Sequence, residues 1–261
     1  MPFATTFIYT MMNTENVNSV ARNFNIGVEE ILNSNAITDN YSPVRKAILT
    51  IPNINSYSSN VYYNVSSGDH LYGISYRFLS SPELIAGINS TITNANLIYV
   101  NQKIAVPAFI HTIQNNESLL DISNLSGISM AGLARANADR PSFSYNRLPN
   151  GFDLVIPFHS STRTVITNPA PGSKIDSNSL LQGYASEFEG SFLYCVIDDN
   201  NQVLLEASGV APWNAGTYYG SFSVPLQLSR EPSAPKGRIF IWAYDEASGH
   251  LIDLVDTQIF F

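Results

Sequence analysis

The chain has little charge. Asp, Glu, Lys and Arg make up only 13% of its 261 residues, against about 25% in an average soluble protein. The 13 basic residues are outnumbered by 21 acidic ones and nowhere form a run. Because nucleic acid and anionic membranes are held by clustered Lys and Arg, neither is expected as the main partner. Asn, Ser, Thr and Tyr must cover the surface instead, which is typical of an extracytoplasmic or coat-type protein.

Cysteine and long apolar runs are also scarce. The single Cys195 excludes an internal disulfide and a cysteine-based zinc site, and its apolar neighbours GSFLYCVID predict a buried side chain. No stretch approaches the roughly 20 apolar residues of a membrane-spanning helix. The first residues, MPFATTFIYTMMNTEN, carry no basic residue ahead of their apolar patch and no clear cleavage site, so we expect no signal peptide there.

Motifs of catalytic chemistry are missing as well. No nucleophile elbow, phosphate-binding loop or dinucleotide fingerprint occurs. Metal-ligand spacing is absent from the four histidines, His70, His111, His159 and His250. The acidic pairs Glu29–Glu30 and Asp198–Asp199 are expected at a helix start and in a hairpin turn, both solvated. We therefore expect no enzyme activity, no metal and no cofactor.

A pattern of about 50 residues recurs three times between residues 1 and 157. Its clearest copy reads YNVSSGDHLYGISYRF, then SPELIAGIN and LIYVNQKIAVP. Three anchors keep the same order in each copy, and the first two keep the same spacing: Tyr9, Asn35 and Pro52; Tyr63, Asn89 and Pro107; His111, Asn137 and Pro157. Such agreement is hard to obtain by chance, so the sequence predicts three tandem repeats.

The periodicity changes in a fixed order within the clearest copy. Residues 63–65 alternate like a strand, residues 71–78 recur at helical intervals, and Asp69 stands where an N-cap oxygen would accept the first free amides. A second helix is predicted over 83–89, and residues 103–106 alternate again. The predicted inward positions of the two helices are Leu71, Ile74, Ser75, Phe78, Leu84, Ile85 and Ile88. Each repeat is thus a small α+β unit of strand, helix, helix and strand.

The pattern Y-x-V-x-x-G-D-x-L-x-x-I-S-x-x-F, the later Asn and the closing Q-x-I-x-V-P resemble the LysM family, a bacterial cell-wall-binding module. The middle copy is nearly complete. The first copy replaces Gly-Asp with Thr14-Glu15, and the third has Asn116-Glu117 and lacks the aromatic residue that Phe78 supplies. The resemblance implies binding of glycans that contain N-acetylglucosamine, namely peptidoglycan or chitin.

In this family the ligand lies in a shallow groove between the loop after the first strand and the loop after the second helix. Carried over to the middle copy, the resemblance implies glycan-binding residues Gly68, Asp69, His70 and Leu71 on one side, and Asn89, Ile98 and Tyr99 on the other. Weaker candidates are Thr14, Glu15 and Asn16 in the first copy, and Asn116, Glu117 and Ser118 in the third. An N-acetyl group offers an amide to bond and a methyl to pack, so backbone polar groups beside apolar side chains suit it. A structural role stays open for each residue: Asp69 as a helix cap, for example, and Leu71 as core.

After residue 158 the helical periodicity ends and the sequence is dominated by strand-like runs. Residues 159–166 are predicted as a linker, and strand-like runs separated by turn signals follow: LLQGYAS, GSFLYCVIDD, QVLLEAS, GSFSVPL, GRIFIWAY and LVDTQIFF. Phe192, Tyr194 and Val196 are expected on one face, alternating with Leu193, Cys195 and Ile197 on the other. Several strands at such spacing predict a β-sandwich of about 95 residues.

This region resembles the immunoglobulin-like domain of bacterial spore germination proteins. The resemblance rests on Pro169–Gly172, Gly183–Ala185, Phe188-Glu189, the turn before Gln202-Val203, and Phe222. It implies an interaction or spacer module, without catalytic or ligand residues.

We therefore predict a multidomain chain, with small α+β repeats at 1–56, 57–108 and 109–158, a linker at 159–166 and an all-β immunoglobulin-like sandwich at 167–261. The expected function is non-enzymatic binding of peptidoglycan or spore cortex, with the sandwich facing a protein partner, in sporulation or germination. The short links between copies predict that several grooves engage one glycan strand. The expected location is the spore cortex or coat, or the cell wall, of a spore-forming bacterium. A structural spore-coat scaffold whose repeats bind proteins, and a cortex-lytic enzyme, are the alternatives.

Overall fold

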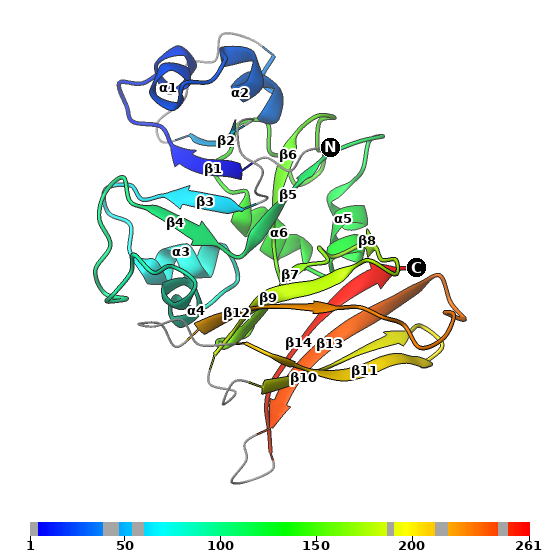
Figure 1. The fold of residues 1–261 in the computed structure, drawn as a ribbon. Helices are drawn as coiled ribbons and strands as arrows, with labels where there is room; N and C mark the ends of the chain where they lie inside the picture. The colour runs from blue at the N-terminus through cyan, green and yellow to red at the C-terminus, as the bar shows by residue number, and fades with distance from the viewer. Residues whose placement is uncertain (1–4, 39–46, 54–59, 187–190, 212–218, 245–249) are drawn as a thin grey trace. The chain divides into compact units, whose positions relative to one another are not determined.

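The computed structural model describes residues 5–38, 47–53, 60–186, 191–211, 219–244 and 250–261 (Figure 1). The chain divides into two units. The first contains residues 1–78, 96–123 and 128–157, and the second contains residues 79–95, 124–127 and 158–261. A multidomain chain with an α+β N-terminal region and all-β C-terminal sheets is confirmed.

The order strand, helix, helix, strand occurs three times along the N-terminal region. Segment 1 contains β1 (Thr5–Thr10), α1 (Val17–Phe24), α2 (Val28–Ser34) and β2 (Ile48–Asn53). Segment 2 contains β3 (Val61–Asn64), α3 (Leu71–Arg77), α4 (Pro82–Gly87) and β4 (Lys103–Val106). Segment 3 contains β5 (Ala108–Thr112), α5 (Leu119–Ser126), α6 (Met130–Ala136) and β6 (Asp153–Pro157). The helix predicted over 83–89 thus begins one residue earlier and ends at Gly87.

Segments 1 and 2 share a sheet in the order β2-β1-β3-β4, whereas β5 and β6 form a separate pair. The central pairing is parallel and sets Ile8 opposite Tyr63. The outer pairings, β1 with β2 and β3 with β4, are antiparallel. This parallel pairing joins two segments that each carry only two strands, and it could not be read from either segment's own pattern.

Most side chains at the predicted inward positions are buried. Leu71, Ile74, Ser75, Phe78, Leu84 and Ile85 are buried as expected, and Ile88 is half-buried. Segments 1 and 3 have cores of their own. The first comprises Tyr9, Met11, Val17, Val20, Ala21, Ile31, Ala47, Leu49 and Ile51, and the second Ile113, Leu119, Ile122, Ile128, Leu133, Leu148, Phe152, Leu154 and Ile156.

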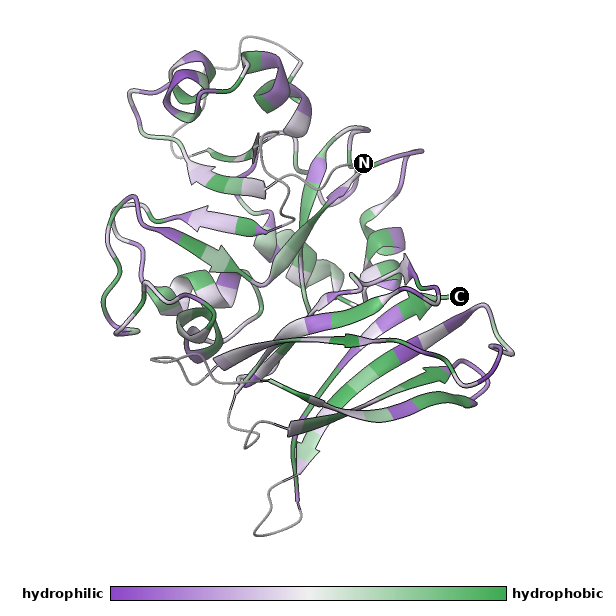
Figure 2. Cartoon of the chain, viewed as in Figure 1, coloured by the Kyte–Doolittle hydropathy of each residue, from purple (hydrophilic) through white to green (hydrophobic). Residues whose placement is uncertain are grey.

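The C-terminal strands form two sheets, in the orders β11-β10-β13-β14-β8 and β12-β9-β7. Their bounds are β7 (Thr164–Asn168), β8 (Ser173–Lys174), β9 (Leu180–Ser186), β10 (Ser191–Asp198), β11 (Val203–Val210), β12 (Tyr219–Pro225), β13 (Lys236–Tyr244) and β14 (Leu251–Phe260). Figure 2 shows hydrophobic residues interrupted by hydrophilic ones along these strands. The predicted linker at 159–166 is therefore too long, because residues 164–166 already pair with β9.

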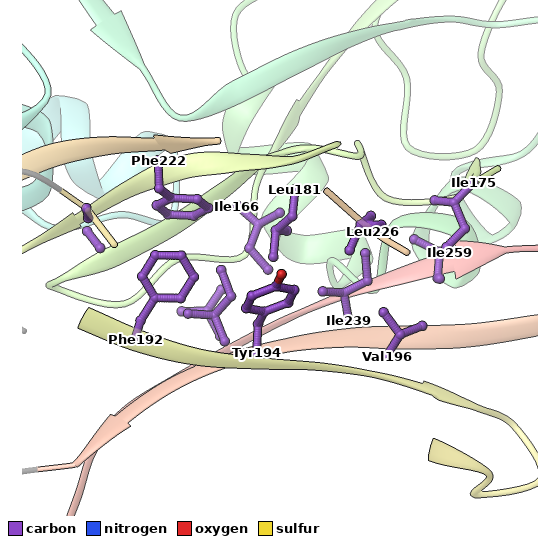
Figure 3. Packing of buried hydrophobic residues seen from close by; sticks show 14 of the residues in the cluster. Ile166, Ile175, Leu181, Phe192, Tyr194, Val196, Phe222, Leu226, Ile239 and Ile259 are labelled. Atoms are coloured by element: carbon purple, nitrogen blue, oxygen red, sulfur yellow. The ribbon is translucent and has the colours of Figure 1, made fainter. Parts of the chain in front are cut away.

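The core of this unit lies between the two sheets. Phe192, Tyr194 and Val196 of β10 belong to it, as the alternation predicts, and Figure 3 shows the Phe192 ring facing Phe222 of the opposite sheet. The two ring centroids are 4.6 Å apart. Cys195 is buried on the other face, and burial raises the pKa of its thiol.

Asp198 departs from its expected solvated role. The residue is only 2% exposed, and its carboxylate accepts hydrogen bonds from the backbone of Asn200, Gln202 and Ser233. The Ser233 hydroxyl also donates to it, at 2.7 Å. These bonds, with the Ser233 hydroxyl first, hold the pKa of Asp198 below its usual value. The carboxylate organises the β10–β11 turn and anchors a distant loop, which local turn chemistry alone does not reveal.

Candidate functional site

A tight turn between β3 and α3 forms one side of the site predicted from the sequence. The Asp69 carboxylate accepts hydrogen bonds from the Ser66 backbone N–H, at 2.7 Å, and from the Tyr63 hydroxyl, at 3.0 Å. Burial, and then the charge of Asp69, raise the pKa of Tyr63 to about 12. Gly68 has a φ of +90°, is exposed and would place a Cβ in open space. The turn therefore presents accessible backbone on a rigid base.

The N-cap role expected for Asp69 is wrong. The N-cap of α3 is His70, and its side chain makes no capping hydrogen bond. Asp69 lies one residue too early, and its carboxylate points back to the turn and to the end of β3.

The loop before β4 lies against the base of this turn. The Gln102 carbonyl accepts from the Val65 N–H, at 2.9 Å, and the Asn101 N–H donates to the Val65 carbonyl, at 2.8 Å. The Gln102 side chain in turn accepts from the Tyr99 N–H. Ile98 is half-buried and Tyr99 is 62% exposed. The structure thus brings this predicted loop and the Gly68 turn together.

The predicted residues nearest the start of α3 differ in exposure. His70 is exposed, and its ring stacks on that of Tyr72 with centroids 6.4 Å apart. Tyr72 is itself 68% exposed and lies beside the predicted residues without being one of them. Leu71 between them is buried and packs as core. In the sequence, the signal that could have identified Tyr72 is an aromatic residue at the start of the predicted helix, directly after the predicted site residue Leu71.

Asn89, in the second unit, is buried, and its side-chain amide donates to the Ile85 carbonyl at 2.7 Å. The corresponding asparagines of segments 1 and 3 show the same bond. The amide of Asn35 donates to Ile31 and Thr50, and that of Asn137 to Leu133 and Val155, all at the backbone carbonyl. The recurring Asn therefore closes the C-terminus of the second helix, and in segments 1 and 3 ties it to the second strand. Its part in ligand binding stays a prediction.

The weaker candidates make similar local bonds. Glu15 accepts from the Tyr9 hydroxyl and the Met12 N–H, and Glu117 bonds the His111 ring and the Gln114 N–H. The remaining candidates lie on the exposed surface: Thr14, Asn16, Asn116 and Ser118. Of these, Asn16 caps α1, the Asn116 N–H donates to the Asn150 side chain, and Ser118 exchanges hydrogen bonds with Asp121. All three segments thus use a carboxylate to tie the turn to the first strand.

A buried arginine joins segments 1 and 3, although no motif in the sequence indicates it. Arg140 is 5% exposed, and its guanidinium donates to the Asn137 side chain (2.8 Å) and the Asp153 carbonyl of segment 3. It also donates to the Thr50 hydroxyl (2.8 Å) and the Asn35 side chain (3.3 Å) of segment 1. Burial lowers its pKa to about 9, and the nearby Asp153 charge partly offsets this.

Neither a membrane-spanning helix nor a group of potential metal ligands occurs among the residues whose positions are described. The Gly68 turn and the Tyr99 loop of the first unit are polar loops with the exposed aromatic side chains Tyr72 and Tyr99 beside them. Such surfaces suit uncharged polar ligands.

Two families match parts of the chain. The LysM domain matches residues 63–107, the middle segment, and the immunoglobulin-like domain of bacterial spore germination matches residues 164–250. The chain thus contains one LysM domain and one spore-germination immunoglobulin-like domain. The first suggests binding of peptidoglycan or N-acetylglucosamine, and the second suggests a part in spore germination; together they fit a spore or cell-wall location.

Three solved structures are similar over parts of their length. The spore cortex-lytic enzyme SleL of Bacillus cereus is 24% identical with a TM-score of 0.30, and the match covers 39% of this chain and 22% of the enzyme. SleL of Bacillus megaterium QM B1551 is 20% identical with a TM-score of 0.20, and the match covers 45% of this chain and 24% of that enzyme. The ectodomain of a receptor-like kinase is 18% identical with a TM-score of 0.27, and the match covers 59% of this chain and 90% of the ectodomain. The chain thus spans less than a quarter of either lytic enzyme, and no curated protein matches it.

Proposed function

We propose that this chain is a non-enzymatic glycan-binding protein of the spore cortex, spore coat or cell wall, acting in sporulation or germination. Its ligand is a polymer containing N-acetylglucosamine, bound by the turn around Gly68 and the loop around Tyr99. The observation that supports this most is the LysM domain at residues 63–107, with the Gly68 turn exposed and the Tyr99 loop hydrogen-bonded to its base.

The chemistry of these loops supports a neutral sugar as ligand. The backbone at Gly68 is unobstructed, so its polar groups are open to hydrogen bonds from hydroxyl or acetamido groups. Tyr99 and Tyr72 add exposed ring faces. The Asp69 carboxylate is already bonded to Ser66 and Tyr63, so its role in this proposal is to hold the turn in shape.

Segments 1 and 3 are proposed to be LysM-type modules that support segment 2. In each, the loop after the second helix contacts the other segment: the Ser142 hydroxyl donates to the Ala36 carbonyl, and the Ile48 N–H donates to the Asp139 carbonyl. Because a LysM-type groove needs that loop, mutual docking leaves it less open to glycan. One groove, rather than several, then dominates binding, in contrast to the expectation from the short links.

The immunoglobulin-like unit is proposed to present the glycan-bound protein to a spore or wall protein. Its strands carry large apolar side chains on the surface, of which Val210, Leu251 and Leu254 are each at least half exposed. These side chains provide area for a protein contact without a catalytic centre.

The test is co-sedimentation of the full chain with purified vegetative peptidoglycan, cortex peptidoglycan and chitin, together with an assay for released reducing sugar. We expect retention on at least one polymer and no sugar release. Retention on none would favour the scaffold function, in which the segments bind proteins. Release of reducing sugar would establish a lytic enzyme instead.

A further inference from the structure

The two central strands of the larger C-terminal sheet, β10 and β13, are apolar on both faces. A sheet of a sandwich normally buries one face and solvates the other, so apolar and polar residues alternate along its strands. Figure 3 shows the inward residues of β10, Phe192, Tyr194 and Val196, turned toward the opposite sheet. The outward residues are apolar as well over most of both strands: Leu193, Cys195 and Ile197 on β10, and Phe240, Trp242 and Tyr244 on β13.

The strand register places these outward side chains in rows. Leu193 of β10 is opposite Trp242, and Trp242 is opposite Leu254 of β14. Cys195 is opposite Phe240 in the next row. Leu254 is 53% exposed, and Leu193, Phe240 and Trp242 are half-buried. We call the outward residues of β10, β11, β13 and β14 the outer face. A contiguous apolar surface of this kind marks a protein contact.

Charged side chains stand at the two margins of the outer face. On the β11 side Glu206 is exposed, and no ion pair to it occurs among the described residues. On the β14 side Asp256, in the same row as Glu206 and Phe240, forms an ion pair with Arg238 of β13. The Arg238 side chain is 53% exposed. Because a guanidinium has five N–H donors, it can bond a second carboxylate.

Two further cationic or titratable groups border the outer face. The Nδ1 atom of His159 lies 3.9 Å from the Asp256 carboxylate at the β14 margin. Lys236 lies two residues before Arg238 on β13, with its Nζ over the Phe260 ring at 5.2 Å. Both groups lie outside the row of Leu193 and Trp242. The centre of the outer face therefore remains apolar.

A second copy of the chain complements this arrangement. Two sheets pack face to face with their strands nearly aligned, and a two-fold axis along the strands, between β10 and β13, relates two identical faces in this way. The axis lays β10 of one copy over β13 of the other, and β11 over β14. Leu193 then meets Trp242 of the second copy, and Glu206 comes beside the pair of Arg238 and Asp256. Each Arg238 lies between two carboxylates, one from each copy.

The size of the outer face suits a weak dimer. Four strands about 4.8 Å apart, with about six residues of about 3.4 Å along each, cover on the order of 400 Å² per copy. Stable complexes bury about 800 Å² of accessible surface per partner. The net charge of −8 on each copy also opposes association. We therefore expect a dissociation constant in the micromolar range.

We propose that two copies of this chain dimerise through the outer faces of their immunoglobulin-like units. This rests on the proposed function, because it names a second copy as the protein partner of that unit. Each dimer carries two LysM domains, so it engages one insoluble polymer at two points. The second contact is intramolecular, and retention on the polymer rises although the affinity of each glycan site is unchanged.

The experiment is sedimentation equilibrium of the full chain at about 1–100 µM and about 0.15 M salt, where charges farther apart than about 8 Å are largely screened. We expect a reversible equilibrium between monomer and dimer. Leu254→Asp should abolish the dimer. The matched control is Leu180→Asp, since Leu180 is 40% exposed on β9 of the other sheet, and it should dimerise like the unaltered chain.

Exchange of the margin charges tests the predicted pairing. Glu206→Arg places a cation beside Arg238 of the second copy and should raise the dissociation constant about tenfold or more. Combining it with Arg238→Glu exchanges the two charges and should restore the dissociation constant to within about threefold of the original. This restoration also shows that Glu206→Arg weakens the dimer without unfolding the sandwich.

A chain that stays monomeric at about 100 µM, or a dimer that neither Leu254→Asp nor Glu206→Arg weakens, would overturn the proposal. A double variant no better than Glu206→Arg would overturn the pairing of the two margins. The glycan function is tested separately. Leu254→Asp should bind chitotetraose like the unaltered chain and be retained less on insoluble peptidoglycan. A dimer that is retained on no polymer would contradict the proposed function and leave the dimer in place.

Discussion

Arg140 should be the residue on which the first unit depends most. Replacing it by Met keeps an unbranched side chain of similar length but removes the guanidinium. The change deletes hydrogen bonds to four groups, two in segment 3 and two in segment 1. It also removes the stacking of the guanidinium on Phe152, where the distance to the ring centroid is 4.3 Å.

The expected loss in the free energy of unfolding depends on the hydrogen-bond acceptors that remain in the Arg140→Met variant. Removing one partner from a buried charged network costs about 3–5 kcal/mol. The acceptors here keep some partners, since Thr50 N–H still donates to Asn35 and Val155 N–H to Asn137. Met also avoids the cost of burying a charge. We therefore expect a loss of about 3 kcal/mol in the free energy of unfolding, at the lower end of that range.

Denaturant unfolding of the full chain, followed with two spectroscopic probes, can show which of the two units loses stability. Trp242 lies in β13 of the second unit, and the first unit has no tryptophan in its sequence, so tryptophan fluorescence reports the second unit. Helix circular dichroism reports mainly the first. Arg140→Met should shift the dichroism transition to lower denaturant and leave the fluorescence transition in place. The control Arg238→Met, which removes an exposed ion pair with Asp256, should change stability by no more than about 1 kcal/mol. An unchanged dichroism transition in Arg140→Met would refute the reasoning.

Two further predictions concern the second unit. Gly183→Ala should destabilise the second unit by about 1–3 kcal/mol through overpacking, because a Cβ there would lie 2.0 Å from the Val165 carbonyl oxygen. The loss is measured as a shift of the fluorescence transition to lower denaturant. An unshifted transition would mean that β9 and β7 move apart without cost. Asp198 has a pKa below its unfolded value of about 3.9, so its stabilisation is complete above that pH and is lost as the pH falls through the folded-state pKa. Asp198→Asn should therefore lower stability at pH 7 and flatten its decline below about pH 4 in acid-unfolding curves, and an identical slope in both proteins would contradict this.

Much of the fold is predictable from the sequence, since local patterns determine it. The alternation at Phe192, Tyr194 and Val196 predicts the inward face of β10, and the helical spacing from Leu71 to Phe78 predicts α3. Each of these signals lies within one element. The predicted linker includes the first three residues of β7 (Thr164–Asn168), because this short run is polar at both ends.

The site is less predictable because its residues meet across segments. The recurring Asn35 and Asn137 are visible as anchors, but the arginine that bonds both lies in a loop of only one segment. Segments 1 and 2 share a sheet because β1 pairs with β3, and neither segment's own pattern indicates that pairing. The sequence does not determine the partner of Asp69, since a carboxylate before a helix can bond either forward to the helix or back to the strand, and here it bonds back to Tyr63 and Ser66.

The central claim is that the Gly68 turn binds glycan. Gly68→Trp and Gly151→Trp offer a matched pair, because both glycines are exposed, have positive φ values (+90° and +81°) and would direct a Cβ into open space. Both variants should therefore lose similar stability, about 1–2 kcal/mol for the left-handed backbone. The deciding measurement is chitotetraose affinity by calorimetry. Gly68→Trp should abolish binding while Gly151→Trp binds like the unaltered chain; equal affinity in the two variants would contradict the claim.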